Sequence, residues 1–236
     1  MRKTIVFNHK SLADFGVYIS GKGVFNAPER DSELVEIPGR NGELTLDNGR
    51  YKNISLTYPA FIIRDFKTNV QALRNFLLSQ GGFFRLEDDY HSDEFRMAKW
   101  VGAFEADPIA ELYAANFDLT FSCYPQRFLK EGEQPIEVTG NATITNGHYT
   151  TALPLIRAYG TGSFTISGVT VQITSASSYT DIDCELQEAY KDSLATNCNA
   201  NIVLTNGVFP SLVPGDNSIS LSGITKLEII PRWWIL

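Results

Sequence analysis

The 236-residue sequence has few of the side chains on which most enzyme chemistry depends. It contains three histidines, which lie in separate segments, and three cysteines. Cys123, Cys184 and Cys198 form no Cys-x-x-Cys pair, so their spacing indicates neither a disulfide framework nor a zinc site, and we interpret them as buried free thiols. No Gly-x-Ser-x-Gly motif is present. We therefore predict no catalytic residue, no metal site and no cofactor.

Basic residues are also scarce, and they are unevenly distributed. The net charge is −7; residues 1–130 carry 16 Lys+Arg against 17 Asp+Glu, whereas residues 131–236 carry 4 against 10. Without a block of cations, the chain is poorly suited to nucleic acids or to anionic membranes. No apolar run approaches the roughly 18 residues of a membrane-spanning helix, and the N-terminal apolar segment is too short for a signal peptide. We predict a soluble protein, made in the cytosol, with neither of these partners.

Composition predicts two domains, residues 1–130 and 131–236. The segment 124–135 combines proline, glycine and charge, as connecting segments do. The first domain has strand-like runs with one inserted helix, which indicates a β-sandwich-like domain. The second has 23 Ser+Thr in 106 residues and short alternating runs separated by turn residues, a pattern typical of a β-sandwich. The predicted fold class is mainly β.

The helix is expected from Asp65, as a capping residue, to about Ser79. Its apolar positions follow helical spacing and form one stripe: Phe66, Val70, Leu73 and Leu77. Arg64, Lys67 and Arg74 remain on the outer face, which we interpret as solvated. Strands are expected at residues 83–86, 95–101 and 116–122, and a hairpin at 164–173. His91 lies in an acidic turn whose spacing matches no metal-binding motif, so a solvated turn is favoured.

Two Asn-Gly dipeptides mark a presented loop. Asn41-Gly42 and Asn48-Gly49 accept positive φ at low cost and suit tight turns between antiparallel strands. The second is expected to close a hairpin between residues 44–46 and 51–56. If such a hairpin lends a strand to a neighbouring copy, its candidate inter-subunit contacts are Arg40, Asn41, Gly42, Asn48 and Gly49.

Residues 180–186 alternate, which predicts Ile182, Cys184 and Leu186 facing inward and Asp181, Asp183 and Glu185 facing outward. Two carboxylates on one strand face have a separation that glycosidases use, but the outer face of a sandwich is normally solvated, and we favour that interpretation. In Trp233-Trp234 one ring is expected to face the core, which leaves the other for a glycan or partner contact. Trp234 and Tyr179 are the candidates for that contact.

Several of these segments, in this order, resemble one protein family. They are Asp14-Phe15-Gly16-Val17, the run from Pro38 to Leu44, the helix, Phe95-Arg96-Met97-Ala98, Tyr124-Pro125-Gln126-Arg127-Phe128, Asp183-Cys184-Glu185 and Pro231-Arg232-Trp233-Trp234. Together they resemble the distal tail proteins (Dit) of long-tailed, non-contractile phages of Gram-positive bacteria. Each motif alone is short, but the resemblance runs nearly end to end.

The resemblance implies a homohexameric ring made by the N-terminal domain and a galectin-like C-terminal β-sandwich. It also implies a structural role at the virion tail tip, with the tail tube protein on one ring face, the tail-tip protein on the other and receptor-binding proteins at the periphery. The sequence has no room for an inserted carbohydrate-binding module. Two alternatives stay open: an adhesin that binds cell-wall saccharide through Tyr149, Tyr159, Tyr179 or Trp234, and a wall hydrolase that uses the acidic residues of 181–185.

Overall fold

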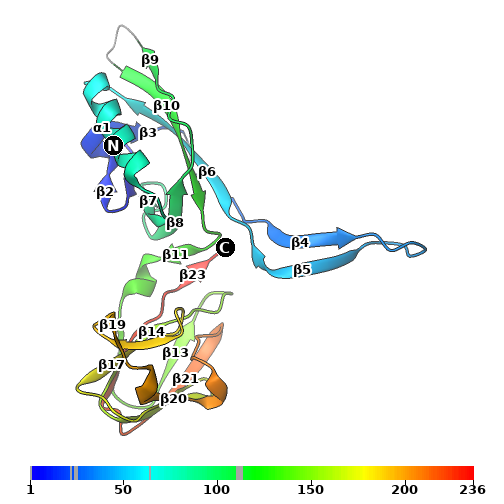
Figure 1. Cartoon of the computed structure of the whole chain (residues 1–236), viewed down its shortest axis with the longest axis vertical. Helices are drawn as coiled ribbons and strands as arrows, with labels where there is room; N and C mark the ends of the chain where they lie inside the picture. Colours follow the sequence, from blue (N-terminus) through cyan, green and yellow to red (C-terminus); the bar gives the residue numbers. More distant parts are fainter. Residues whose placement is uncertain (1, 22, 24–25, 64, 110–113) are drawn as a thin grey trace. The chain divides into compact units, whose positions relative to one another are not determined.

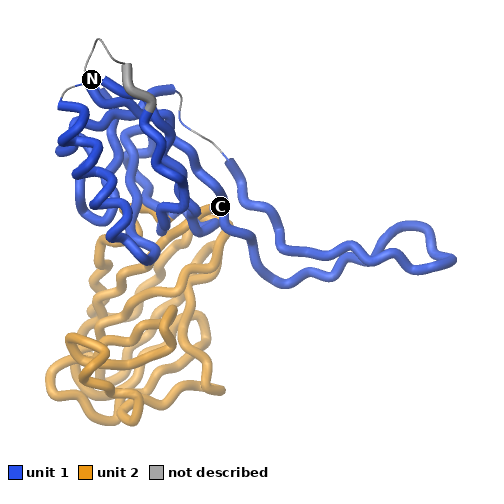
Figure 2. The backbone as a smooth tube through the Cα atoms, turned by 45° about the horizontal axis from the view of Figure 1, so that its top comes forward, with its two compact units in different colours: residues 1–127, 236 blue, residues 128–235 orange. Residues whose placement is uncertain are grey.

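Two compact units make up the computed structural model, which describes residues 2–21, 23, 26–63, 65–109 and 114–236 (Figure 1). The first unit comprises residues 1–127 with Leu236, and the second comprises residues 128–235 (Figure 2). The described residues are mainly strand, with a single α-helix, so the predicted fold class is confirmed.

The first unit contains one large sheet, a separate hairpin and the helix. Its strands are β1 (Ile5–Phe7), β2 (Lys10–Ser11), β3 (Val17–Ile19), β4 (Arg30–Val35), β5 (Leu44–Tyr51), β6 (Ile54–Ile62), β7 (Phe84–Asp88), β8 (Glu94–Trp100), β9 (Asp107–Ile109) and β10 (Ala114–Cys123). A 3₁₀ turn, η1 (Leu12–Phe15), joins β2 to β3, so Asp14-Phe15-Gly16 is part of a turn. The strands predicted at 83–86, 95–101 and 116–122 are present as β7, β8 and β10.

The large sheet curls around an apolar core. Its order is β2-β1-β7-β8-β10-β6-β3, with β9 paired to β10. Lys3, just before β1, pairs with Ile19 of β3, which brings the two ends of the sheet together. Long β6 and β10 alternate buried and exposed positions, as period-2 strands with one face on a core should. Phe7 and Phe121, both fully buried, lie at the centre, with ring centroids 5.1 Å apart.

Helix α1 (Phe66–Ser79) closes this core and has the predicted extent. Leu73 and Leu77 are fully buried, and Phe66 and Val70 pack against them at the edge. Asp65 occupies the N-cap position, as expected, but its backbone angles are left-handed and its side chain makes no capping hydrogen bond. Arg64 lies outside the described residues.

The acidic turn before β8 is not simply solvated. Asp88 Oδ1 accepts hydrogen bonds from the main-chain N–H of Tyr90 and of His91, and Asp88 Oδ2 accepts one from the Tyr58 hydroxyl at 2.7 Å. His91 Nδ1 lies 3.1 Å from Asp88 Oδ1, and both side chains are largely buried. The carboxylate therefore organises the turn internally.

The second unit is built from short strands. They are β12 (Ile136–Val138), β13 (Ala142–Asn146), β14 (Leu155–Tyr159), β15 (Gly162–Ile166), β16 (Val169–Ile173), β17 (Tyr179–Asp183), β18 (Glu188–Lys191), β19 (Ser193–Asn197), β20 (Ile202–Leu204), β21 (Gly215–Ser222), β22 (Lys226–Ile230) and β23 (Trp234–Ile235). Strand β11 (Arg127–Leu129) begins at the unit boundary and pairs with β23. The 3₁₀ turns are η2 (Lys130–Glu133), η3 (Asn199–Asn201) and η4 (Thr205–Gly207).

These strands form two sheets that share one core. The orders are β12-β22-β14-β17-β18-β19 and β13-β21-β15-β16-β20. Phe164 and Ile166 of one sheet and Ile156 and Ile229 of the other belong to the same buried cluster, as in a sandwich. The predicted hairpin at 164–173 is present as β15 and β16. Cys184 is buried here, as Cys123 is in the first unit, whereas Cys198 is partly exposed.

The prediction for residues 180–186 is wrong in two respects. Strand β17 ends at Asp183, and Leu186 is 54% exposed instead of facing inward. Asp181 and Asp183 are buried, at 3% and 2% exposure, because each has an arginine partner. Arg157 Nε lies 2.6 Å from Asp181 Oδ1, and both terminal nitrogens of Arg232 lie 2.8 Å from the Asp183 oxygens.

Candidate assembly surface

Strands β4 and β5 form a hairpin, residues 29–52, which we call the arm (Figure 1). They make a two-stranded sheet of their own, and nearly all of their residues are exposed. An isolated two-stranded hairpin is at best marginally stable in water. The arm therefore needs either internal reinforcement or a partner.

The structure corrects the position of the turn. Val35 pairs with Leu44, so the strands are joined by residues 36–43, in which Gly39 and Gly42 have positive φ. Asn48-Gly49 does not close a hairpin; it lies inside β5, opposite an irregularity between Arg30 and Ser32. Gly49 has φ 71° and its N–H donates to Asp47 Oδ1 at 2.8 Å, so the dipeptide forms a β-bulge. Asn-Gly signals positive φ, which a bulge needs as much as a turn does.

Ion pairs reinforce the base of the arm. Arg30 contacts Asp47 with two nitrogens, at 2.7 and 2.9 Å. The Arg50–Asp31 and Lys52–Glu29 pairs have N–O distances of 2.6 and 3.1 Å. The hydrogen bond from Arg30 lowers the pKa of Asp47, and the one from Arg50 lowers the pKa of Asp31. All three pairs are at least partly exposed, so each contributes little on its own.

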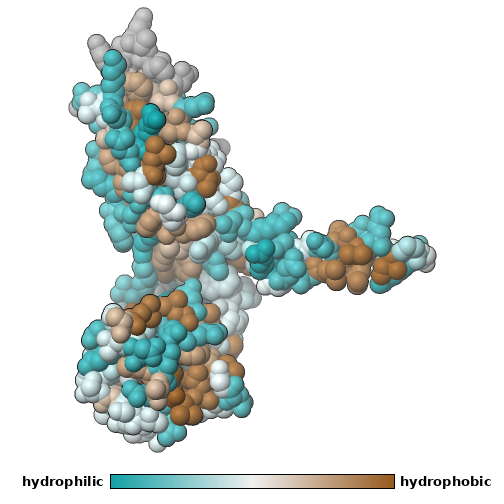
Figure 3. Space-filling model, viewed as in Figure 1, coloured by the Kyte–Doolittle hydropathy of each residue, from teal (hydrophilic) through white to brown (hydrophobic). Residues whose placement is uncertain are grey.

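The distal half of the arm is apolar and uncovered. Residues directly opposite each other in an antiparallel pair share a face. Val35 is opposite Leu44 and Glu33 is opposite Leu46, so these four side chains lie on one face. Leu44 is 40% and Leu46 48% exposed, and Leu34, on the other face, is 63% exposed. Figure 3 shows hydrophobic residues along this part of the arm. Such an exposed apolar surface is typical of a protein–protein contact.

The five candidate contact residues fall in two places on the arm. Arg40, Asn41 and Gly42 lie in the distal connection, and Asn48 and Gly49 form the bulge nearer the base. The apolar residues of the arm were missed by the sequence analysis. The sequence does contain a signal for the hairpin that carries them. Residues 29–31 and 47–52 have complementary charges, which indicates that these two segments pair with each other.

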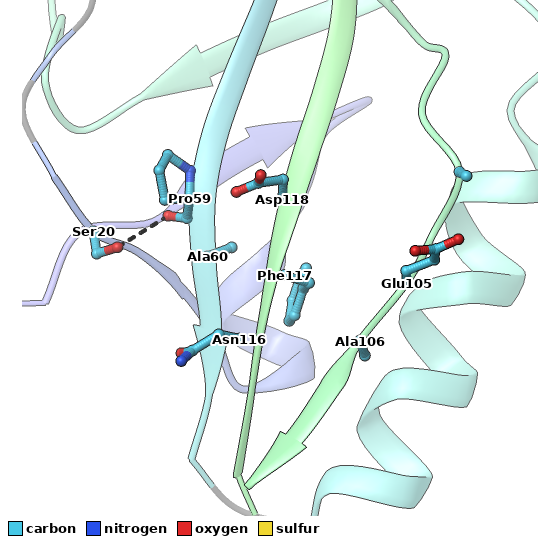
Figure 4. Close-up of a pocket in the computed structure, with 9 residues that line it drawn as sticks. Ser20, Pro59, Ala60, Glu105, Ala106, Asn116, Phe117 and Asp118 are labelled. Carbon is cyan, nitrogen blue, oxygen red and sulfur yellow. Dashed lines mark hydrogen bonds between the residues drawn. The ribbon is translucent and has the colours of Figure 1, made fainter.

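A groove of about 900 Å³ lies on the first unit beside β6 and β10 (Figure 4). Ala60 and Phe117 form a buried apolar floor, and Glu105, Asn116 and Asp118 are exposed around it. Among the described residues that line it, there is no histidine, cysteine or lysine. The two carboxylates are in open solvent, so the groove is an acidic surface and lacks the enclosed setting of an acid–base site.

In the second unit, Tyr179 and Trp234 are already engaged. The Tyr179 hydroxyl donates to Asp192, and the Arg157 guanidinium lies 4.3 Å from the centre of its ring. Trp234 is partly buried and its Nε1 donates to the Thr151 carbonyl at 3.1 Å, whereas Trp233 is in the core, as one of the two was expected to be. Tyr149, by contrast, is fully exposed.

Among the residues that the structure describes, no group of three or more His, Cys, Asp or Glu side chains is placed to hold a metal ion. Within the same residues, no helix has the length and hydropathy needed to cross a bilayer.

Two β-rich units and an arm with exposed apolar residues place the chain in the class of mainly-β proteins. No protein-family model and no curated protein matches the sequence. Solved structures do match the fold. SPP1 Dit, described as a paradigm of the hub adsorption apparatus in phages that infect Gram-positive bacteria, is similar over 100% of both chains, with a TM-score of 0.74 and 14% identity.

Two structures of the phage P2 baseplate in its activated conformation, with Ca and with Sr, are also similar. They match 97% of this chain and 97% and 96% of theirs, with TM-scores of 0.54 and 0.53 and 9% identity. This chain therefore has the Dit fold, which is the fold that its sequence motifs predict.

Proposed function

We propose that this chain is a structural virion protein, the distal tail adaptor of a long-tailed phage, and that it works without enzymatic activity. The observation that carries the proposal is the end-to-end match to the fold of SPP1 Dit, which includes both units. The resemblance of ordered motifs along the sequence supports it independently. We place the protein at the virion tail tip after synthesis in the cytoplasm of the host bacterium.

Six copies form a ring, and the arm supplies a contact between neighbours. The support is physical: the distal arm has apolar side chains that stay exposed among the residues that the structure describes. Its proposed contacts with the neighbour are Arg40, Asn41 and Gly42 in the distal connection and Asn48 and Gly49 in the bulge. The first unit is the ring-forming domain, and the second is a galectin-like domain. The partners are the tail tube protein on one ring face, the tail-tip protein on the other and receptor-binding proteins at the periphery.

Light scattering of the purified chain over a concentration series tests the ring. Six copies of the 26.3 kDa chain have a mass of about 158 kDa. A particle of that mass with a central hole in negative-stain images supports the proposal. A species that stays at 26.3 kDa alone, and also when mixed with tail tube and tail-tip proteins of the same phage, contradicts it.

One observation favours a second role, an adhesin function of the second unit. Tyr149 is fully exposed and can stack on a saccharide ring. Tyr179 and Trp234 are the further proposed glycan or partner contacts. Binding to purified host wall polysaccharide that is lost in Tyr149→Ala and Trp234→Ala supports this role, and unchanged binding in both variants contradicts it.

A further inference from the structure

Helix α1 presents a basic stripe to solvent. Lys67, Gln71, Arg74 and Leu78 follow helical spacing, so they lie on one face of the helix, and all four are exposed. Leu78 is 59% exposed. The helix contains no acidic residue, and Lys67 and Arg74 have no ion-pair partner among the described residues. The stripe thus combines two unpaired cations with an exposed leucine.

The arm has the opposite character. Its apolar face carries Glu33 beside Val35, Leu44 and Leu46. Residues 32–46 contain three glutamates and one arginine, a net charge of −2. Glu33 and Glu36 are exposed, and neither has an ion-pair partner among the described residues. Aliphatic side chains with nearby carboxylates match the leucine and the cations of the helix stripe.

We propose that the distal arm of one copy docks on the α1 stripe of the next copy. This inference rests on the proposed ring and names the surface that accepts the arm. The arm and the stripe are different surfaces of the same chain, so the contact is heterologous, the type that closes into a ring when the rotation between copies permits. Each copy then gives one arm and receives one.

The charge pattern also argues against the groove beside β6 and β10 as the docking site of the arm. The groove beside β6 and β10 exposes Glu105 and Asp118, neither of which has an ion-pair partner among the described residues. An arm of net negative charge would meet two more negative charges there, which is unfavourable. The α1 stripe offers two positive charges instead.

Charge exchange tests the inference with three double variants of the full chain. The arm variant is Glu33→Lys with Glu36→Lys, and the helix variant is Lys67→Glu with Arg74→Glu. The groove variant, Glu105→Lys with Asp118→Lys, is the matched control, because it makes the same charge change as the arm variant at another exposed site. A fourth chain combines the arm and helix changes. Sedimentation velocity measures the concentration at which the ring forms, and circular dichroism confirms that each variant is folded.

The arm and helix variants are each expected to need an about tenfold or higher protein concentration to form the ring, and the combined variant is expected to recover most of the loss. The groove variant should assemble like the wild type. Recovery in the combined chain is the decisive result, because misfolding of either variant cannot produce it. If the combined chain needs as high a concentration to form the ring as the arm variant does, the docking site is wrong, although the wild-type ring is not contradicted. A wild-type chain that assembles neither alone nor with tail tube and tail-tip proteins of the same phage contradicts the ring itself, and the docking with it.

Discussion

Arg232 has two roles at the end of the second unit. Its backbone adopts φ 56°, and its N–H donates to the Gly132 carbonyl at 2.8 Å. Its guanidinium forms a bidentate ion pair with Asp183, whose side chain is 3% exposed. A buried carboxylate without its partner is costly, because protein replaces the water that would solvate it.

Arg232→Ala is therefore expected to lower the free energy of unfolding by roughly 3 kcal/mol, near the lower end of the range for a broken buried pair. Arg232 is itself 25% exposed, which allows water to reach part of the site. Urea unfolding followed by tryptophan fluorescence measures the change. Glu185→Gln, which removes the exposed second partner at 3.2 Å, is the control and should have a much smaller effect. Equal losses in the two variants would contradict this assignment.

The same pair predicts a pH dependence. Burial raises the pKa of Asp183, but hydrogen bonds from Arg232 and from the main-chain N–H groups of Leu186 and Glu185 outweigh it and lower the pKa below the usual 3.8. A lowered pKa contributes stability that is fully present above the unfolded value and is lost as the pH falls through the folded value.

The stability difference between the wild type and Asp183→Asn should therefore be constant above about pH 5 and should shrink below the unfolded value. Urea unfolding at a series of pH values measures this difference. A difference that grows on acidification would show that the carboxylate is not stabilised in its ionised form.

At the scale of elements, substitutions on the arm should affect assembly of the ring without affecting folding of the single chain. Leu44 and Leu46 are exposed on its apolar face, so replacing them removes little burial within the single chain. We expect Leu44→Ser with Leu46→Ser to change the free energy of unfolding by no more than about 0.5 kcal/mol and to abolish the ring.

Thermal unfolding and light scattering on the same samples separate the two effects. Leu34→Ser, on the opposite face of the arm, is the matched control and should leave most of the assembly intact. If this control disrupts the ring as strongly as the double variant, the two faces are not distinct and the face assignment is wrong.

The sequence predicts those strands and the helix whose apolar residues repeat at a regular local spacing. Residues 116–122 alternate because β10 has one face on the core, and α1 repeats its apolar positions for the same reason. The buried state of Asp181 and Asp183 was not readable, since their partners Arg157 and Arg232 are 24 and 49 positions away. Likewise, Asn48-Gly49 shows that positive φ is needed but does not show whether a turn or a bulge needs it.

At the scale of the molecule, each unit has its own buried cluster. The residues 128–235 contain both sheets of the second core, so we expect this fragment to fold alone and to unfold in one cooperative transition. Because it lacks the arm and α1, it should also remain monomeric. Calorimetry and sedimentation of the fragment measure these properties. A fragment without a cooperative transition would show that the second core depends on the first unit.

The segments at which the chain enters and leaves the second unit are hydrogen-bonded to each other. The N–H of Leu129 donates to the Trp233 carbonyl at 2.9 Å, and the N–H of Arg232 donates to the Gly132 carbonyl at 2.8 Å. A side chain at Gly132 would overlap the main-chain nitrogen of Trp233, so the two segments are in direct contact. A tensile load applied through these two segments is therefore carried by this short pair of strands, and the two sheets of the sandwich are spared mechanical strain.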